Sequence, residues 1–248
     1  MKKIITPSEL PGDDPLGFLG HRLETCRERL DAAAARSGRS PAHVRLIAVT
    51  KYVDPAVVRL LHRLGLRDFG ENRIQEAELK AESLRDLEDL RLHFIGHLQR
   101  NKVRKALGFA SLASLDSLAL LEELEKRLAG SPGSLPAILV EVNISGEDHK
   151  TGLPPEGLEE LLEAAARSAE VGPRIRGLMG MAPLVEEPEA ARPFFRRLRE
   201  LRDRHRDAGF LPPDAELSMG MSADFEVAVE EGATLVRLGT TLYAEDEP

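Results

Sequence analysis

The feature that most constrains the fold is a regular alternation of short apolar runs with amphipathic helical patterns. Eight apolar runs of strand length occur, at residues 45–50, 66–69, 92–96, 110–115, 137–143, 174–181, 216–220 and 234–239. Seven helical patterns separate them, at residues 54–64, 72–86, 98–107, 117–129, 155–169, 188–207 and 223–231. Because strands that alternate with helices pair in parallel, the pattern predicts an α/β fold with a parallel sheet.

Two parallel folds compete, the closed (β/α)8 TIM-type barrel and the doubly wound open sheet. Eight units in a chain of 248 residues match the usual size of the barrel. The turn after the first strand, residues 50–55, contains no glycine, so the dinucleotide-binding fingerprint of the open sheet is absent there. We therefore predict a single (β/α)8 barrel.

The predicted domain organisation is simple. Apolar residues recur at helical spacing from Leu16 to Ala33, which predicts an extra helix ahead of the barrel. Residues 1–14 are rich in Pro, Gly and Asp and are predicted to form an N-terminal tail. Since no long linker divides the rest of the chain, residues 15–248 are expected to form one barrel domain.

Charge and composition exclude several classes of function. A net charge of −8 gives no basic footprint for nucleic acid. No segment approaches the roughly 18 apolar residues of a membrane span, and HExxH and CxxC metal motifs do not occur. The one cysteine, Cys26, excludes an internal disulfide framework and fits a reducing compartment. A cytoplasmic protein that binds neither nucleic acid nor membrane is expected.

Candidate functional residues follow the strands, because the active groups of such barrels lie at the carboxyl ends of the strands. Lys51 follows the first strand. Ser218 and Ser222 belong to the segment after the seventh strand, and Gly239 and Thr240 follow the eighth. These two loops are frequent phosphate sites in (β/α)8 barrels. Ser222 is expected to be the N-cap of the next helix, which would direct free N–H groups at an anion.

Arg237 lies inside the apolar strand TLVRLG, where an unpaired guanidinium is costly. It therefore needs an anion. One candidate is the carboxylate of Glu141, which lies within another apolar strand. The other candidate is a bound phosphate, whose geometry suits arginine. The residues alone leave both open.

Lys51 at a strand end facing a phosphate site has a clear chemical use. Its amine, when unprotonated, can form a Schiff base with a carbonyl. Two classes of barrel use this chemistry: aldolase-type lyases that capture a sugar-phosphate carbonyl, and barrels that hold pyridoxal phosphate.

Longer motifs favour the second class. The segments AVTKYV, RDFGENRIQEA, HFIGHLQRNKVRK, IRGLMGMAP and LSMGMSADFEVAVEEGATLVRLGTTLY resemble the pyridoxal phosphate homeostasis proteins, and the resemblance covers residues 15–243. That family is similar to the N-terminal barrel domain of alanine racemase. The resemblance implies that pyridoxal 5′-phosphate forms a Schiff base with Lys51. It also implies that five residues surround the phosphate (Ser218, Ser222, Arg237, Gly239 and Thr240) and that two lie near the ring (Asn72 and Met181).

Two departures bear on the activity that the resemblance implies. Ala113 stands where the family usually has a histidine. Because the sequence ends soon after Tyr243, we expect no second domain like the one that supplies alanine racemase with a catalytic tyrosine on the opposite face of the cofactor. Because racemisation needs a second acid–base group there, we expect a non-enzymatic homeostasis protein, with a weak amino-acid racemase as the alternative. The expected recipients of the cofactor are pyridoxal phosphate-dependent apo-enzymes, and the family resemblance favours a monomer.

Overall fold

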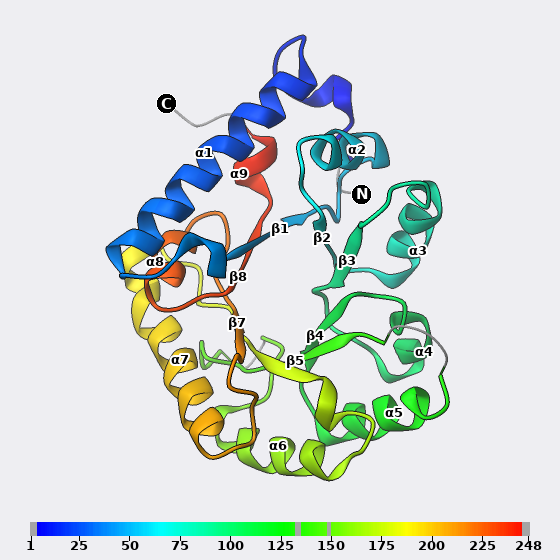
Figure 1. The fold of residues 1–248 in the computed structure, drawn as a ribbon, viewed down its shortest axis with the longest axis vertical. Coiled ribbons are helices and arrows are strands. Elements are labelled where there is room, and N and C mark those ends of the chain that lie inside the picture. Colours follow the sequence, from blue (N-terminus) through cyan, green and yellow to red (C-terminus); the bar gives the residue numbers. More distant parts are fainter. Residues whose placement is uncertain (1–3, 132–134, 148–149, 245–248) are drawn as a thin grey trace.

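The computed structural model, which describes residues 4–131, 135–147 and 150–244, is a closed barrel of eight parallel strands (Figure 1). The strands are β1 Arg45–Val49, β2 Asp68–Glu71, β3 Arg91–Phe94, β4 Ser111–Leu115, β5 Ala137–Glu141, β6 Ile175–Met179, β7 Glu216–Ser218 and β8 Leu235–Leu238. Each strand pairs with the next, and the barrel closes where residues 45–48 of β1 oppose residues 235–238 of β8. The predicted (β/α)8 barrel is confirmed.

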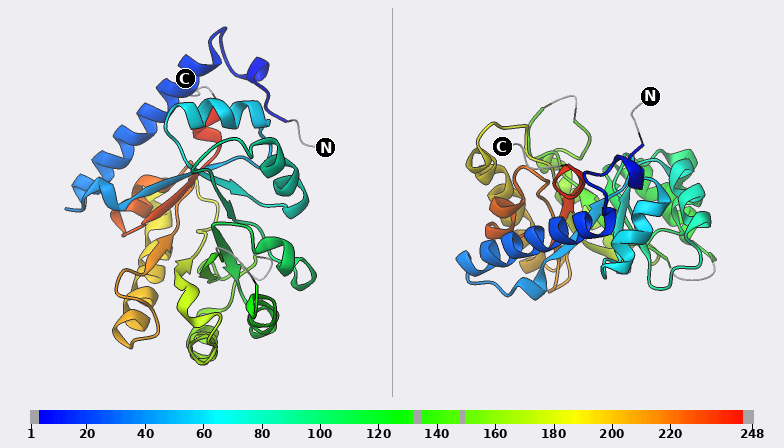
Figure 2. Two further views of the ribbon diagram at one scale, coloured as in Figure 1. Left: turned by 45° about the vertical axis from the view of Figure 1, so that its right-hand side comes forward. Right: turned by 90° about the horizontal axis from the view of Figure 1, so that it is seen from above.

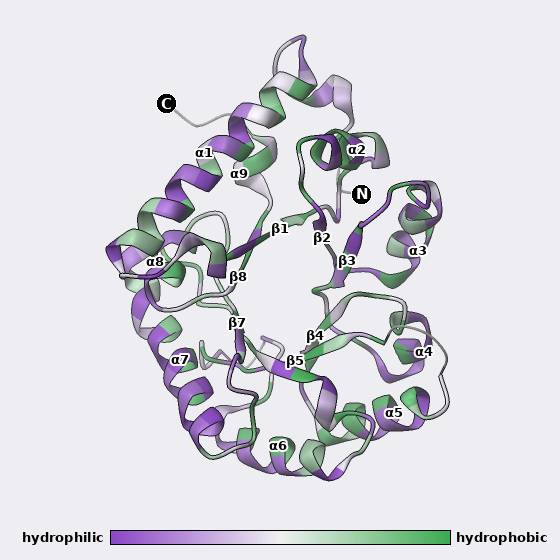
Figure 3. Cartoon of the chain, viewed as in Figure 1, coloured by the Kyte–Doolittle hydropathy of each residue, from purple (hydrophilic) through white to green (hydrophobic). Residues whose placement is uncertain are grey.

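Helices surround the strands on the outside, and all three views show this arrangement (Figure 1, Figure 2). They are α1 Pro15–Arg36, α2 Pro55–Arg63, α3 Ile74–Ser83, α4 Val103–Ala106, α5 Leu118–Leu128, α6 Leu158–Arg167, α7 Arg192–Asp207, α8 Phe225–Glu230 and α9 Thr240–Tyr243. Most carry one polar and one apolar face (Figure 3). No helix in the described part of the chain is long and apolar enough to cross a membrane.

The extra N-terminal helix is present and follows from its sequence. Asp14 begins it, because its carboxylate accepts a hydrogen bond from the Gly17 amide at 3.0 Å. Its apolar stripe is buried; Leu19 and Leu23 are at most 1% exposed. Burial of each such leucine contributes roughly 1.5–3 kcal/mol. α1 packs this face against α2, α8 and α9.

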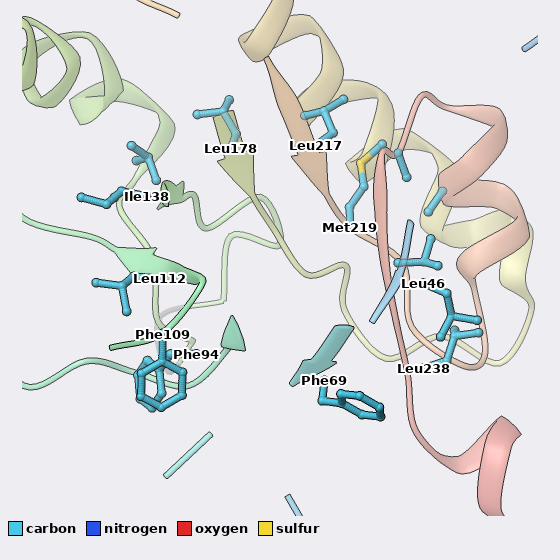
Figure 4. Packing of buried hydrophobic residues seen from close by; sticks show 14 of the residues in the cluster. Leu46, Phe69, Phe94, Phe109, Leu112, Ile138, Leu178, Leu217, Met219 and Leu238 are labelled. Carbon is cyan, nitrogen blue, oxygen red and sulfur yellow. The ribbon is translucent and has the colours of Figure 1, made fainter. Parts of the chain in front are cut away.

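The core has two layers because successive side chains of a strand point to opposite faces. The outer layer fills the space between strands and helices, and Figure 4 shows Leu112, Ile138, Leu178 and Leu217 as its members on β4 to β7. The inner layer fills the barrel itself. Five buried residues form it: Ile47, Ala113, Leu139, Met179 and Leu235. The partly buried Ile95 and Met181 pack against these five.

Polar side chains close the amino-terminal end of the barrel. The carboxylate of Asp68 accepts two hydrogen bonds from Arg91, at 2.8 and 2.6 Å, and lies 2.7 Å from Nε2 of His93. The other ring nitrogen of His93 lies 2.7 Å from Oγ of Ser111. Burial alone would raise the pKa of the Asp68 carboxyl, but its hydrogen bonds to Arg91 and His93 outweigh burial and hold the pKa well below its usual range. The network therefore joins β2, β3 and β4.

The described part of the predicted tail contacts the turn that carries Lys51. Ile5 pairs in parallel with Val53. The Ile5 amide donates to the Tyr52 carbonyl at 2.8 Å, and the Asp54 amide donates to the Ile5 carbonyl at 2.9 Å. The division into a tail, residues 1–14, and a barrel domain, residues 15–248, stays a prediction, and residues 1–3, 132–134, 148–149 and 245–248 lie outside the described residues.

Candidate functional site

Lys51 lies where the sequence predicts, directly after β1 at the carboxyl end of the barrel. The Thr50 amide before it donates to the Gly70 carbonyl at 2.9 Å, so parallel pairing with β2 continues up to Lys51. Lys51 is half-buried. With Val49, Gly239, Thr240 and other residues it lines a cavity of about 200 Å³. The structure therefore brings the predicted lysine and the loop after β8 to one cavity.

A second cavity adjoins Lys51 on the side of α3. It has a volume of about 420 Å³ and is lined by Tyr52, Arg73 and Leu79 among others. The Lys51 ammonium lies 5.8 Å from the centroid of the Tyr52 ring, which is within range of a cation–π interaction. Of these two cavities, the one of about 200 Å³ contains Gly239 and Thr240, which belong to a predicted phosphate loop, and the other contains neither. We therefore take the smaller cavity as the candidate site.

The loops after β7 and β8 meet at the hydroxyl of Ser222. This oxygen accepts hydrogen bonds from the backbone N–H groups of Gly239, at 3.2 Å, and Thr241, at 3.3 Å. A Cβ atom added to Gly239 would meet nothing nearer than Val49, at 3.6 Å, so the glycine leaves space open beside these donors. Backbone N–H groups that converge on one point are typical of anion-binding sites.

The prediction that Ser222 is an N-cap is wrong. α8 begins at Phe225 with Asp224 as its N-cap residue. A turn precedes the helix, because the amides of Asp224 and Phe225 both donate to the Met221 carbonyl, at 3.1 and 2.9 Å. This turn delays the helix by two residues, and the Ser222 hydroxyl accepts from the Gly239 and Thr241 amides instead.

Arg237 is buried and contacts neutral oxygens. Its Nη1 donates to Oγ of Ser218 at 2.6 Å, and its Nη2 lies 3.3 Å from the carbonyl oxygen of Gly180. Burial lowers the pKa of Arg237 to about 10, with the carboxylates of Glu141 and Asp224 acting in the opposite direction. Within the described residues, no carboxylate forms an ion pair with this guanidinium.

Glu141 bonds elsewhere, so it is not the direct partner that the sequence left open. Its Oε1 accepts a hydrogen bond from the Thr151 hydroxyl at 2.5 Å. Burial raises the pKa of the Glu141 carboxyl. The positive charge of Arg237 is therefore left without a contacting anion in the described structure, which is favourable for an anionic ligand.

Asn72 and Met181 also lie at the carboxyl end of the barrel. Asn72 follows β2, and its Oδ1 is buried with no hydrogen-bond partner among the described residues. Its backbone touches Gly96 so closely that a Cβ there would lie 2.3 Å from the Asn72 carbonyl oxygen. Met181 packs against the inner layer of the core, of which Ala113 is a member. The position that departs from the family pattern thus lies inside the barrel.

The sequence analysis gave no site role to three residues near Lys51: Glu71, Lys80 and Tyr243. Glu71 and Lys80 form an ion pair, with Nζ and Oε1 separated by 2.5 Å. The hydroxyl of Tyr243 is buried without a partner among the described residues, and burial raises the pKa of this tyrosine. A signal for Lys80 existed, because it shares the helical spacing of the buried residues Ile74 and Ala77.

Comparison with known proteins decides the family. The alanine racemase N-terminal domain family matches residues 22–247. The pyridoxal phosphate homeostasis protein of Aquifex aeolicus is 46% identical over 226 residues, which cover 90% of this chain and 96% of the relative. That of Pseudomonas aeruginosa is 44% identical over 230 residues, covering 92% and 96%. The chain belongs to the pyridoxal phosphate homeostasis protein family.

A similar protein of known structure has the same fold. PipY of Synechococcus elongatus, whose structure has pyridoxal phosphate bound, matches with a TM-score of 0.77 and 36% identity. The match covers 91% of this chain and 100% of PipY. The family resemblance predicted from the sequence motifs is confirmed.

Proposed function

We propose that this protein binds pyridoxal 5′-phosphate at Lys51 and takes part in homeostasis of that cofactor, without established turnover. One observation carries the proposal: Lys51 lines the same cavity as Gly239 and Thr240. When bound, the cofactor would supply a phosphate and an aldehyde group that is reactive towards the Lys51 amine. The names of the homologous proteins support the same function.

The residues present fit such a group. The hydroxyl oxygen of Ser222 stands where two backbone N–H groups converge, and a phosphate oxygen is a stronger acceptor for them. The buried charge of Arg237, bonded to Ser218, would favour the negative groups of the cofactor. Five residues would surround the phosphate: Ser218, Ser222, Arg237, Gly239 and Thr240. Met181 would lie near the ring, as would Asn72, whose buried Oδ1 has no hydrogen-bond partner in the described part of the chain.

The side chains around the site favour a homeostasis protein over a racemase. Racemisation needs an acid–base group on each face of the reacting carbon, with a pKa near the working pH. Tyr243 is one of only two tyrosines, and burial raises its pKa, which makes it a poor base at neutral pH. The half-buried Lys51 is well suited to holding and releasing a cofactor.

We further propose that pyridoxal phosphate-dependent apo-enzymes receive the cofactor and that the protein acts as a cytoplasmic monomer. The net charge of −8 favours a monomer, because like-charged molecules repel one another. The single cysteine fits the reducing cytoplasm. Sedimentation equilibrium would test the monomer, and transfer of the cofactor to a purified apo-transaminase would test delivery.

The central experiment is the absorption spectrum of the protein after incubation with pyridoxal phosphate and dialysis. We expect a visible band that borohydride abolishes, leaving a stable adduct at Lys51. Lys51→Ala should lose the band and keep the thermal midpoint, because a half-buried lysine at a strand end contributes little to packing. Lys102→Ala is the matched control and should keep both. A reducible adduct at full stoichiometry in Lys51→Ala would refute the assignment.

A further inference from the structure

A buried ion pair lies directly behind Lys51. Glu71, the last residue of β2, is fully buried, and Lys80 of α3 is 8% exposed. The Lys80 ammonium donates to Oε1 of Glu71 at 2.5 Å and to the backbone carbonyl of Thr50 at 2.6 Å. The Thr50 hydroxyl donates to the same Glu71 oxygen at 2.6 Å. One ammonium therefore joins the ends of β1 and β2.

Lys80 binds Thr50 and Glu71, and each of these comes just before a residue that we propose to contact the cofactor. Thr50 precedes Lys51, and Glu71 precedes Asn72. Val49 is opposite Gly70 in the β1–β2 register, so Lys51 and Asn72 are the matching residues two positions further along. We propose that Lys80 is a positioning residue that fixes the ends of β1 and β2 so that Lys51 and Asn72 reach one cofactor. This inference rests on the proposed function.

Stability alone is a weak reason for such a pair. Removing two charges from water costs free energy that their attraction regains only in part, and apolar residues of similar volume often serve as well. The pair is also incompletely satisfied, since Oε2 of Glu71 is buried without a hydrogen-bond partner among the described residues. What apolar residues cannot replace is the hydrogen bond from Nζ to the Thr50 carbonyl, which fixes the backbone beside Lys51.

The inference predicts that cofactor binding and stability separate on mutation. Lys80→Met leaves the Glu71 charge alone and should lower both the thermal midpoint and the affinity for pyridoxal phosphate. Adding Glu71→Met removes the lone charge and should restore the midpoint. The affinity and the borohydride-reducible fraction should stay roughly tenfold reduced, as when the outer partners of a metal ligand are removed. Lys105→Met, which breaks an exposed pair with Glu78, is the matched control and should change neither.

The outcomes separate this inference from the proposed function. If wild type forms the reducible adduct and the double variant binds as tightly as wild type, the ion pair only stabilises the fold and the inference is overturned. If wild type forms no adduct at Lys51, the proposed function is wrong, and so is the inference that rests on it. Should the Lys80 variants not fold, Glu71→Gln decides, because it keeps the size of the side chain and weakens the hold on the Lys80 ammonium that also binds the Thr50 carbonyl. Severalfold weaker binding of pyridoxal phosphate supports the inference, and unchanged binding overturns it.

Discussion

At the scale of single residues, Arg237 is buried and forms no ion pair with any described residue. Arg192 and Arg199, by contrast, form ion pairs with Glu231, at 3.2 and 2.7 Å. Arg237 instead contacts a hydroxyl and a carbonyl. A guanidinium that is buried with neutral partners keeps its charge available to a ligand.

We expect Arg237→Gln to keep the fold and weaken binding of pyridoxal phosphate. The glutamine amide can still donate hydrogen bonds to the Ser218 hydroxyl and the Gly180 carbonyl. The charge-assisted hydrogen bond to the cofactor phosphate, worth roughly 1.5–3 kcal/mol, is lost. Equilibrium dialysis should therefore show a roughly 10- to 100-fold weaker affinity. Arg197→Gln, on the exposed side of α7, is the control. Retention equal to wild type would mean that Arg237 serves the packing of β7 and β8 alone.

At the scale of elements, the sequence predicted the helices and strands well and their ends less well. The helix expected at residues 98–107 is the short α4, preceded by a 3-10 turn, and the helix expected at residues 223–231 is shortened to α8. Both differences fall at loops after strands, where side chains and backbone of neighbouring loops compete for the first helical N–H groups. The close approach of the β7 loop to α8 depends on Gly220, which has φ +93°.

Gly220→Ala should therefore destabilise the protein through packing as well as through backbone conformation. The added Cβ would lie 2.6 Å from Cβ of Ala228 and 3.0 Å from Cα of Phe225. Gly12→Ala is a matched control, since Gly12 also has a positive φ, +77°, but no atom within 4 Å of an added Cβ. Urea unfolding should show a loss about 1–3 kcal/mol larger for Gly220→Ala. Equal losses would contradict the role of the contact.

At the scale of the whole molecule, the two ends of the barrel have different tasks. The carboxyl end holds the candidate site, and the amino-terminal end holds the Asp68 network, which joins three strands. Outside the barrel, α1 is tied to α8 through the ion pair of Arg29 and Glu226, at 3.1 Å. It is tied to α9 through Arg22, whose Nε donates to the Thr241 carbonyl at 2.9 Å. The extra helix thus supports the short helix that carries Thr240.

The Asp68 network predicts how stability depends on pH. The folded pKa of Asp68 lies below its unfolded value, about 3.9. Its contribution is therefore fully present above about pH 4 and is lost as the pH falls towards the folded pKa. In urea unfolding, Asp68→Asn should be less stable than wild type at pH 7, and the difference should shrink below pH 4. A difference that is constant from neutral to acid pH would contradict this linkage.

The sequence by itself determined the barrel, its extra helix and the position of Lys51. Hydrophobic periodicity and strand ends are local properties, so they can be read without knowing which segments meet. Only the tertiary structure decided the partners of the charged and hydroxyl groups. Ser222 bonds to residues 17 and 19 positions away, and Arg237 bonds to Ser218 rather than pairing with Glu141. These contacts depend on how strands and loops far apart in the chain are aligned. Several side chains could chemically serve as the partner of each group, so the sequence alone does not select one.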